Sequence, residues 1–381
     1  MTSAAFRRSD MSLANWREHP HSPWAFQNVS EFVPSAVIRG NGLAETPLVP
    51  LGRFAGIRVM DGAGTEVALP EFLAASHTDT LVVMRGGEVV AEWHAPHVDP
   101  ARPHIIFSIS KSVTGLVGGI LEGQGLLSFD RRVVDYIPDA AGSAYGDLGV
   151  RDLFNMTVSA EFDEIYLDRT GAFDRYRRAM LWNPERADDP TPTLREFLCS
   201  LPKAAHAHGT RHAYRSPHAD MAGLVVEAAS GRRFADLFGE LLWRPLGAHS
   251  DAFITVDRAG NPRTSGGIST TARDLARLGD LVRRGGDGIA PAGFVARLWE
   301  GGDRRLWAEG DQHHLFPGGS YRAYWYAPGE GELAGMGVFG QSLWIDRKTE
   351  TVVVRQASEP LPIDDAMDQC VIAMLRAVSA A

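Results

Sequence analysis

Ser108 and Lys111 are the residues of this 381-residue chain whose types and spacing most clearly could do chemistry. They form an S-x-x-K motif, and residues three apart on a helix lie on one face, so the hydroxyl and the amine can touch. A serine hydroxyl is a weak nucleophile until a neighbouring base removes its proton. Lysine can be that base when burial leaves its amine neutral, whereas arginine stays charged. The pair therefore predicts a nucleophilic serine with a lysine base.

The rarity of lysine in the chain supports a special task for Lys111. The sequence holds three lysines and 35 arginines, so arginine is used wherever any cation suffices. Lys203 lies in a Leu-Pro-Lys loop and Lys348 in an Asp-Arg-Lys-Thr turn, both typical of the surface. The motif alone stays weak, because 23 serines make a chance pairing at this spacing a real alternative.

The setting of the motif favours the functional interpretation. Apolar residues recur at helical spacing behind it, which predicts a buried helix. The residues that carry this pattern are Ile109, Val113, Leu116, Val117, Ile120 and Leu121. Gly115, Gly118 and Gly119 make the helix thin, at a cost of about 1 kcal/mol each relative to alanine. Such a cost is easiest to explain if other elements pack closely around a central helix.

Tyr214 is a candidate for the proton transfer that an acyl-enzyme mechanism needs when the leaving group departs. It precedes a predicted helix over residues 217–231, in which Pro217 lies in the first turn and Gly231 ends the helix. A tyrosine at such a helix start can present its phenol to a cleft. From the residues alone, a tyrosine that only covers apolar packing stays the alternative.

Residues 335–340 match G-x-G-x-x-G, but their setting excludes a dinucleotide site. That interpretation requires a strand before the glycines and a helix after them, whereas here a strand follows near the chain end. The glycines better suit a strand whose backbone approaches a ligand, and a free N–H there could form half of an oxyanion hole. The sequence has no Walker loop, H-E-x-x-H, C-x-x-C or G-x-S-x-G motif, and no cofactor is expected.

Four histidines gather between residues 206 and 218. His206, His208 and His212 form an H-x-H-x3-H pattern in a predicted loop, and His218 follows. Because no acidic ligand stands nearby, the pattern favours a solvated histidine run over a metal site. No metal is expected.

Patterns along the chain predict strands near both ends and helices in the middle. Residues 81–93 and 342–354 each predict a β-hairpin. Further helices are expected over residues 270–283 and 367–379.

The simplest assembly of these elements is one sheet built from residues 51–107 and 290–381, with a mainly helical region over residues 108–289. Residues 1–50 are expected to be an ordered extension with little regular structure that packs on this core. Residues 155–192 are predicted to form a long irregular stretch, and long loops in compact proteins are often functional.

Composition excludes several classes of protein. A hydrophobic content of 44% and a charged content of 22% are ordinary for a soluble globular protein. The net charge of −9 argues against nucleic acid as the main partner. No run of 18 apolar residues predicts a transmembrane helix. Residues 1–10 lack the apolar core of a signal peptide, and Cys199 and Cys370 make no disulfide framework, so a cytoplasmic location is expected.

The order of Ser108/Lys111, Tyr214-Arg215-Ser216 and the glycine strand resembles the class C β-lactamase and D,D-peptidase family, whose motifs are S-x-x-K, Y-x-N and K-T-G. More closely, the chain is similar over nearly its whole length to the 6-aminohexanoate-dimer hydrolases, the nylon-oligomer amidases. The stretches that carry this likeness are residues 24–26, 33–36, 86–92, 108–112, 265–269, 271–277 and 339–346. The resemblance implies an α/β (α+β) fold of the β-lactamase/transpeptidase type, with an antiparallel sheet formed from both chain ends, flanking helices and an inserted mainly helical region.

The resemblance also implies roles for single residues. Ser108 looks like the nucleophile, Lys111 like its base, and Tyr214 like a third catalytic residue that passes a proton to the leaving group. The segment Gly335-Met336-Gly337 stands where K-T-G stands, so the N–H groups of Val338 and Ser108 would form the oxyanion hole. The K-T-G lysine, which in β-lactamases helps hold the drug's carboxylate, is missing here, and efficient β-lactam turnover is therefore not expected.

The substrate-binding residues that the resemblance implies are Tyr166, Arg177, Trp182, Ser216, Ser265, Gly337 and Phe339. Tyr166 matches a loop tyrosine that helps amide over ester cleavage, and Ser216 stands in Y-x-N as in the nylon-dimer hydrolases. Where the efficient amidases place an aspartate for the ammonium end of the substrate, this chain has Arg177. That change implies poor activity on 6-aminohexanoate dimer and a preference for neutral or carboxylate-bearing substrates. An Arg177 that points to solvent, or an Asp174 that replaces the aspartate, stays the alternative.

Three functions remain open. The first is a serine hydrolase that cleaves amide or ester bonds of small acyl substrates. The second is a β-lactamase or D,D-peptidase, which the missing export signal disfavours because those substrates lie outside the cytoplasm. The third is a non-catalytic binding protein of the same fold, which a complete Ser-Lys-Tyr set disfavours. The expected partner is a small amide or ester, with no nucleic acid and no membrane, and a homodimer stays open.

Overall fold

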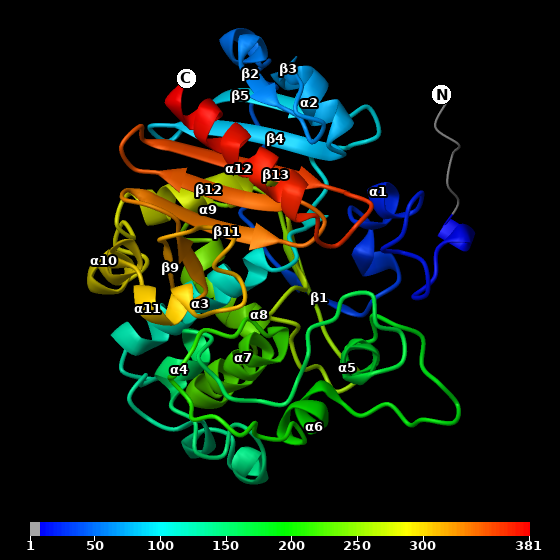
Figure 1. The fold of residues 1–381 in the computed structure, drawn as a ribbon, viewed down its shortest axis with the longest axis vertical. Coiled ribbons are helices and arrows are strands. Elements are labelled where there is room, and N and C mark those ends of the chain that lie inside the picture. Colours follow the sequence, from blue (N-terminus) through cyan, green and yellow to red (C-terminus); the bar gives the residue numbers. More distant parts are fainter. Residues whose placement is uncertain (1–7) are drawn as a thin grey trace.

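The computed structural model describes residues 8–381, in which a sheet-rich part lies above a helical part (Figure 1). The prediction that residues 1–10 carry no signal peptide falls mostly on residues 1–7, which lie outside the described part, as does the beginning of the predicted extension. Within residues 8–381, no helix combines the length and the apolar character that crossing a membrane requires.

A seven-stranded antiparallel sheet joins the two ends of the chain, in the order β5-β4-β13-β12-β11-β10-β9 (Figure 1). Its strands are β4 (Thr78–Arg85), β5 (Glu88–His94), β9 (Ser320–Arg322), β10 (Trp325–Ala327), β11 (Glu332–Gly337), β12 (Gln341–Asp346) and β13 (Thr351–Ala357). The N-terminal hairpin enters the sheet through β4, which pairs with β13 so that Val83 lies opposite Val353. The prediction of one sheet formed from both chain ends is confirmed.

Local sequence explains how this sheet forms. Gly86 and Gly87 both have positive φ, 57° and 91°, as a two-residue turn between right-twisted strands requires. Strands β4 and β13 are buried almost throughout. The reason is that α9 (Ala272–Arg283) covers one face of the sheet and α12 (Asp365–Ala380) covers the other (Figure 1).

The helical part surrounds α3 (Ile109–Gly123), which is buried along nearly its whole length. The other helices are α1 (Ser22–Ala25), α2 (Leu69–Ala75), α4 (Val150–Phe154), α5 (Ala172–Ala179), α6 (Leu194–Cys199), α7 (Ser216–Ser230), α8 (Phe234–Leu237), α10 (Ala292–Glu300) and α11 (Arg304–Ala308). Helix α3 contacts α7 and also the strands β10, β11 and β12. A helix enclosed on all sides is mostly apolar, and its four buried polar side chains, Ser110, Lys111, Ser112 and Thr114, all form hydrogen bonds.

The glycines of α3 are required by close neighbours. A Cβ on Gly115 would lie 2.2 Å from the carbonyl oxygen of Ala323, and one on Gly118 would lie 2.5 Å from the ring of Phe154. Gly119 faces another aromatic ring at the same short distance. The prediction that close packing selects these glycines is confirmed.

The N-terminal extension holds more regular structure than its sequence suggested. It contributes a strand to a second, four-stranded sheet in the order β1-β7-β8-β6. The strands of this sheet are β1 (Ser35–Ile38), β6 (His104–Ile105), β7 (Ala252–Thr255) and β8 (Ile268–Thr270), and β2 (Arg58–Met60) with β3 (Glu66–Ala68) forms a separate ribbon. Trp16 is fully buried, with its ring edge-to-face on Trp182 at 5.2 Å. The extension is therefore part of the core.

Residues 155–192 are only partly irregular, because α5 (Ala172–Ala179) lies within them. Phe173 and Tyr176 turn inward from this helix and are buried. The four charged residues that share the helix with them hide its apolar face in the sequence, so a loop was expected.

Candidate active site

Ser108 lies at the start of α3 as its N-cap residue, yet its side chain does not cap the helix. The residue before it, Phe107, has a φ of 41°, in the left-handed region that non-glycine residues rarely adopt. The Phe107 ring is buried and packs against Phe26 and Trp16. This packed turn leaves the Ser108 hydroxyl free for other partners, beside the partial positive charge of a helix N-terminus.

The amine of Lys111 is held by three oxygen atoms. Its Nζ lies 2.7 Å from Ser108 Oγ, 3.2 Å from Ser216 Oγ and 2.8 Å from the carbonyl oxygen of Ser265. The side chain is buried, with the residue 1% exposed. All three oxygens are formally neutral, so the amine has no carboxylate in direct contact to keep it protonated.

Burial lowers the pKa of Lys111 to about 7. Desolvation is the largest cause, the negative charge of Glu164 opposes it, and the positive charge of Arg263 adds to it. A lysine with this pKa is partly neutral at neutral pH, and its lone pair can then accept the proton of a hydroxyl at 2.7 Å. The predicted contact between Ser108 and Lys111 across one helix turn is present.

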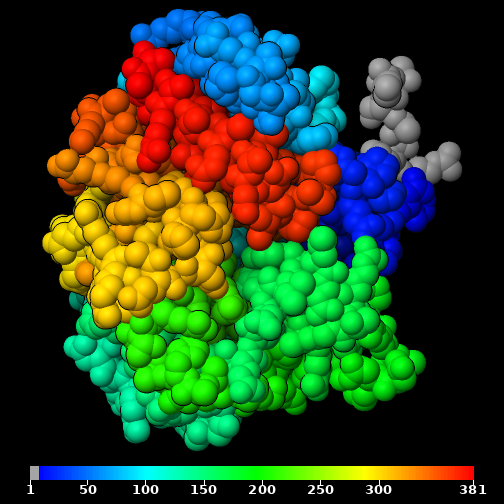
Figure 2. Space-filling model, viewed as in Figure 1, coloured from blue at the N-terminus to red at the C-terminus, as the bar shows by residue number. Residues whose placement is uncertain are grey.

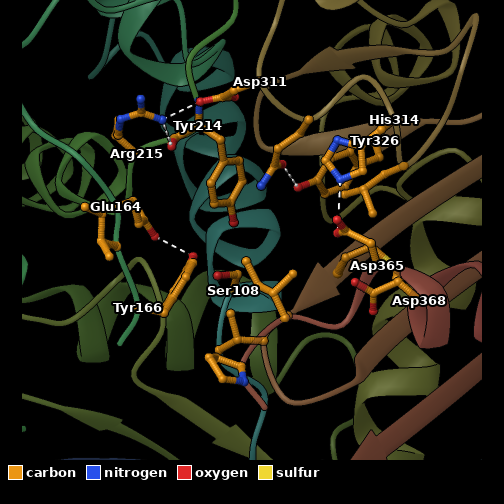
Figure 3. Close-up of a pocket in the computed structure, with 18 of the residues that line it drawn as sticks. Ser108, Glu164, Tyr166, Tyr214, Arg215, Asp311, His314, Tyr326, Asp365 and Asp368 are labelled. Atoms are coloured by element: carbon orange, nitrogen blue, oxygen red, sulfur yellow. Dashed lines mark hydrogen bonds and ion pairs between the residues drawn. The ribbon is translucent and has the colours of Figure 1, made fainter. Parts of the chain in front are cut away.

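Glu164 connects two sides of the site. Its carboxylate accepts hydrogen bonds from the Ser216 hydroxyl at 2.6 Å, from the Ser216 N–H, and from the Tyr166 hydroxyl at 2.6 Å (Figure 3). Through Ser216 it is one hydrogen bond removed from Lys111. Glu164 was not predicted from the sequence, where its place two residues before Tyr166 was the only available signal.

A buried ion pair holds the carbonyl group of Ser265 in place. Arg263 pairs with Asp220, and Asp220 accepts the Ser265 N–H at 2.7 Å. Tyr176 donates its hydroxyl to the same carboxylate. A buried pair adds little net stability because both ions lose hydration, so its observable effect here is to orient the loop that binds Lys111. Sequence reasoning missed Arg263 and Asp220, which stand far apart in the chain.

Tyr214 is buried, and its phenol points toward Ser108 (Figure 3). Lys111 Nζ lies 4.7 Å from the centre of its ring. Burial raises the pKa of Tyr214 above its usual range, although the hydroxyls of Ser108 and Tyr326 act in the other direction. The phenol is therefore protonated at neutral pH and can donate a proton within the site.

Strand β11 brings a second backbone N–H close to that of Ser108. Gly337 packs so tightly that a Cβ on it would lie 3.1 Å from the Ser108 nitrogen and 2.9 Å from the carbonyl oxygen of Ile106. Within the described part of the chain, neither the N–H of Ser108 nor that of Val338 donates to a partner. Two such N–H groups can stabilise the negative charge that develops on a carbonyl oxygen under attack.

A cavity of about 560 Å³ opens above Ser108. Its walls come from three segments far apart in sequence, in the ranges 163–166, 311–315 and 362–368, together with the end of β11. Figure 2 shows the face where the green, orange and red parts of the chain that contain these segments meet. A small acyl substrate fits a cavity of this size.

The predicted substrate-binding residues fall into separate groups. Tyr166 and Gly337 line the cavity above Ser108. Ser216, Ser265 and Trp182 are buried behind its wall. The first two of these hold Lys111, and Trp182 donates its indole N–H into the second sheet. These three residues therefore support the site from behind, and their contact with a substrate stays a prediction.

The two remaining predicted residues, Phe339 and Arg177, line a second cavity of about 320 Å³. Arg177 is half-buried and donates to the Tyr166 carbonyl at 2.6 Å. Asp174 also lines this cavity, where it pairs with two other arginines. Tyr166 and Pro362 border both cavities.

The histidines between residues 206 and 218 do not converge on one point. His212 and His218 are buried in separate aromatic surroundings, and His208 pairs with Asp147 at 3.1 Å. The prediction of a solvated run is wrong for His212 and His218, because packing encloses both rings. In residues 8–381, no group of three or more histidine, cysteine, aspartate or glutamate side chains is arranged to hold a metal ion.

Known proteins match this chain over most of its length. The sequence profile of the β-lactamase family matches residues 70–369. The 6-aminohexanoate-dimer hydrolase of Paenarthrobacter ureafaciens is 34% identical over 360 residues, which cover 92% of this chain and 89% of that protein. A Bacillus anthracis protein provisionally described as a 6-aminohexanoate-dimer hydrolase superposes with a TM-score of 0.89 at 22% identity, covering 99% of this chain and 98% of its own. A mutant class C β-lactamase superposes with a TM-score of 0.57 at 15% identity, covering 82% and 95%.

Proposed function

Since this chain belongs to the β-lactamase family and, within it, to the 6-aminohexanoate-dimer hydrolases, it is a serine hydrolase of amide or ester bonds, and we propose that it acts on small acyl compounds through an acyl-enzyme on Ser108. The substrate carbonyl binds in the cavity above Ser108, where the residues of the S-x-x-K motif and β11 surround it.

Acylation begins when the neutral amine of Lys111 takes the proton of Ser108 Oγ as that oxygen attacks the substrate carbonyl. The N–H groups of Ser108 and Val338 stabilise the negative charge on the carbonyl oxygen. As the bond to the leaving nitrogen or oxygen breaks, Tyr214 gives its proton to the leaving group and regains one from Lys111. Water then attacks the ester, the same residues carry its proton, and Ser108 leaves as the hydroxyl.

The observation that carries this proposal is the contact between a deeply buried amine and a serine hydroxyl. Lys111 Nζ and Ser108 Oγ are 2.7 Å apart, and the neighbours of the amine are neutral oxygens. A lysine buried only for structure needs an ionised partner, because an isolated buried charge is costly. The absence of a direct one favours an amine that works in its neutral form.

Gly335 argues against efficient β-lactam turnover. It stands where the K-T-G lysine would stand, and a Cβ there would lie 3.1 Å from Ser112 Oγ and 3.3 Å from Ile109. A lysine side chain would force both neighbours to move. We therefore expect a β-lactam such as nitrocefin to react slowly compared with a simple ester.

Replacing Ser108 by alanine tests the nucleophile. Ser108→Ala should lower kcat on a p-nitrophenyl ester by about 10³-fold or more. Wild type and variant are each mixed with a slowly hydrolysed ester, and the reaction is quenched rapidly. Mass spectrometry should then find the acyl group on the peptide that contains Ser108 in the wild type and not in the variant. An acyl group on another residue, or a variant with more than a few per cent of the activity, would rule out this proposal.

Replacing Lys111 tests the base. Lys111→Arg should be nearly as damaging as Lys111→Ala, because arginine keeps the charge but cannot accept a proton. The matched control is Lys203→Arg, since Lys203 pairs with Asp147 at the surface, and it should leave the rate unchanged. An active Lys111→Arg variant would show that Lys111 acts through its charge alone.

A further inference from the structure

The second cavity contains two arginines without carboxylate partners. It lies beside the cavity above Ser108 and has a volume of about 320 Å³. Arg169 and Arg186, which also line it, are neutralised by ion pairs with acidic neighbours. In residues 8–381, Arg17 and Arg177 bond to neutral oxygens and form no ion pair. Of the acidic residues that line the cavity, Glu18, Asp174 and Glu185 form ion pairs with other arginines, and Asp168 accepts the N–H groups of Thr170 and Gly171. The charges of Arg17 and Arg177 therefore have, among the described residues, no carboxylate in direct contact.

Both arginines keep N–H groups for a ligand. Arg17 donates to the Trp182 carbonyl at 2.9 Å and to the Asn183 side chain, and Arg177 donates to the Tyr166 carbonyl at 2.6 Å. A guanidinium has five N–H donors, so donors remain on each after these bonds. Burial lowers the pKa of both groups, to about 10 for Arg177, and the charge of Arg177 lowers the pKa of Arg17 further. At a pKa of about 10, Arg177 is still cationic at neutral pH, and a guanidinium such as that of Arg17 stays protonated in proteins.

The second cavity borders the cavity above the catalytic serine. Tyr166 and Pro362 line both cavities, and Phe339, which lines the second, directly follows Val338 of the oxyanion site. A substrate whose carbonyl oxygen binds at Val338 can therefore extend its acyl chain past Tyr166 toward Arg17 and Arg177.

The rim shared by the two cavities carries exposed apolar side chains. Four of its large side chains, Ile165, Leu167, Leu361 and Ile363, are exposed, and they flank Tyr166 and Pro362 in sequence. Exposed apolar side chains around a cavity mark a binding surface for apolar groups. A run of methylene groups would cover them.

We propose that the enzyme prefers acyl groups that end in a carboxylate, which Arg17 and Arg177 bind while the methylene chain crosses the apolar rim. The substrate class is the monoamides and monoesters of aliphatic dicarboxylic acids. The two positive charges attract a carboxylate and repel an ammonium group at the same place. This inference rests on the proposed function, since it requires the acyl carbonyl to lie at Ser108.

The test compares three p-nitrophenyl esters of equal acyl length, which end in a carboxylate, in its methyl ester or in an ammonium group. The adipoyl, monomethyl adipoyl and 6-aminohexanoyl esters supply this set. For the wild type, kcat/KM should be highest for the carboxylate and lowest for the ammonium. Arg17→Gln and Arg177→Gln should each lower the ratio of carboxylate to methyl ester by about tenfold or more. Arg175→Gln removes an exposed charge from the same helix as Arg177 and should leave the ratio unchanged.

The ratio separates binding from folding, because both substrates meet the same folded fraction of each variant. Arg177→Lys should recover part of the ratio, since it restores a charge. A wild type that prefers the methyl ester or the ammonium would overturn the inference, and so would unchanged ratios in both glutamine variants. If Ser108→Ala keeps its activity on the methyl ester, the proposed function fails instead. If the ratio of carboxylate to methyl ester does not change as expected while turnover still depends on Ser108, only the carboxylate site is rejected.

Discussion

The protonation state of Lys111 should set the pH dependence of the reaction. Its pKa of about 7 means that the fraction of neutral amine falls as the pH drops below 7, and kcat/KM should fall with it. Glu164 raises this pKa through its negative charge. Glu164→Gln should therefore shift the acid limb of the profile to lower pH. The measurement is kcat/KM for a neutral ester between about pH 5 and pH 9.

Asp368 provides the control for this experiment. It lines the same cavity, and burial together with the charge of Glu359 raises its pKa to about 7 as well. Asp368→Asn should leave the acid limb in place. A limb that moves in Asp368→Asn and stays in Glu164→Gln would assign the titration to Asp368.

Tyr214 should matter more for amides than for esters. An amine leaving group must be protonated, whereas a phenoxide departs unaided, so Tyr214→Phe should slow a p-nitrophenyl ester much less than a matched alkyl amide. For the amide, the loss should be about 10²-fold or more. Tyr321, whose ring packs edge-on against Tyr214 at 6.3 Å, supplies a matched phenol, and Tyr321→Phe should affect amide and ester alike. Equal losses on the two substrates in Tyr214→Phe would contradict the proton-transfer role.

Helix α3 can hold Ser108 and Lys111 in place because its neighbours pack directly against the backbone of its glycines. Gly115→Ala would place a methyl group 2.2 Å from the Ala323 carbonyl oxygen. We expect it to lower the free energy of unfolding by about 1–3 kcal/mol, measured by urea denaturation. Gly293 in α10 has open space, with its nearest contact at 3.9 Å, so Gly293→Ala should raise stability by about 0.5–1 kcal/mol. Equal effects of the two substitutions would show that packing does not select Gly115.

Elements with a local signal were predictable, and those with distant partners were not. The hairpin of β4 and β5 follows from two glycines between apolar runs, and α3 follows from its apolar spacing. Strand β1 pairs with β7, which lies far along the chain, so no turn nearby in the sequence predicts this strand. In α5, charged residues around Phe173 and Tyr176 hide the apolar side of a short helix. The same rule applies within the site. The contact of Ser108 with Lys111 was predictable because the two residues are three positions apart on one helix, whereas Arg17 and Arg177 are distant in sequence and no local pattern predicts that they line one cavity.

In the whole molecule, the reactive groups and most of the cavity walls come from different parts of the chain. The reactive groups stand on α3, at the start of α7 and at the end of β11, all packed into the core. The walls come from the ranges 163–166, 311–315 and 362–368. Substitutions in partly exposed loops usually change stability little. The choice of substrate can therefore change through these loops while the reactive groups stay in place.

Burial of Lys111 also has a thermodynamic consequence for folding. In the unfolded chain its pKa returns to about 10.4, whereas in the native protein it is about 7. Between these values the unfolded state binds a proton that the native state lacks, so lysine at this position destabilises the fold, and the penalty shrinks as the pH rises. We expect Lys111→Met to be inactive yet to exceed the wild type in free energy of unfolding at pH 7, with a difference that declines toward pH 10 in urea titrations. A difference that does not vary with pH would show that the native amine is not neutralised by burial. If the difference does decline toward pH 10, the activity of this enzyme depends on a residue that destabilises its core. A variant selected for stability alone should then lose the base Lys111 first.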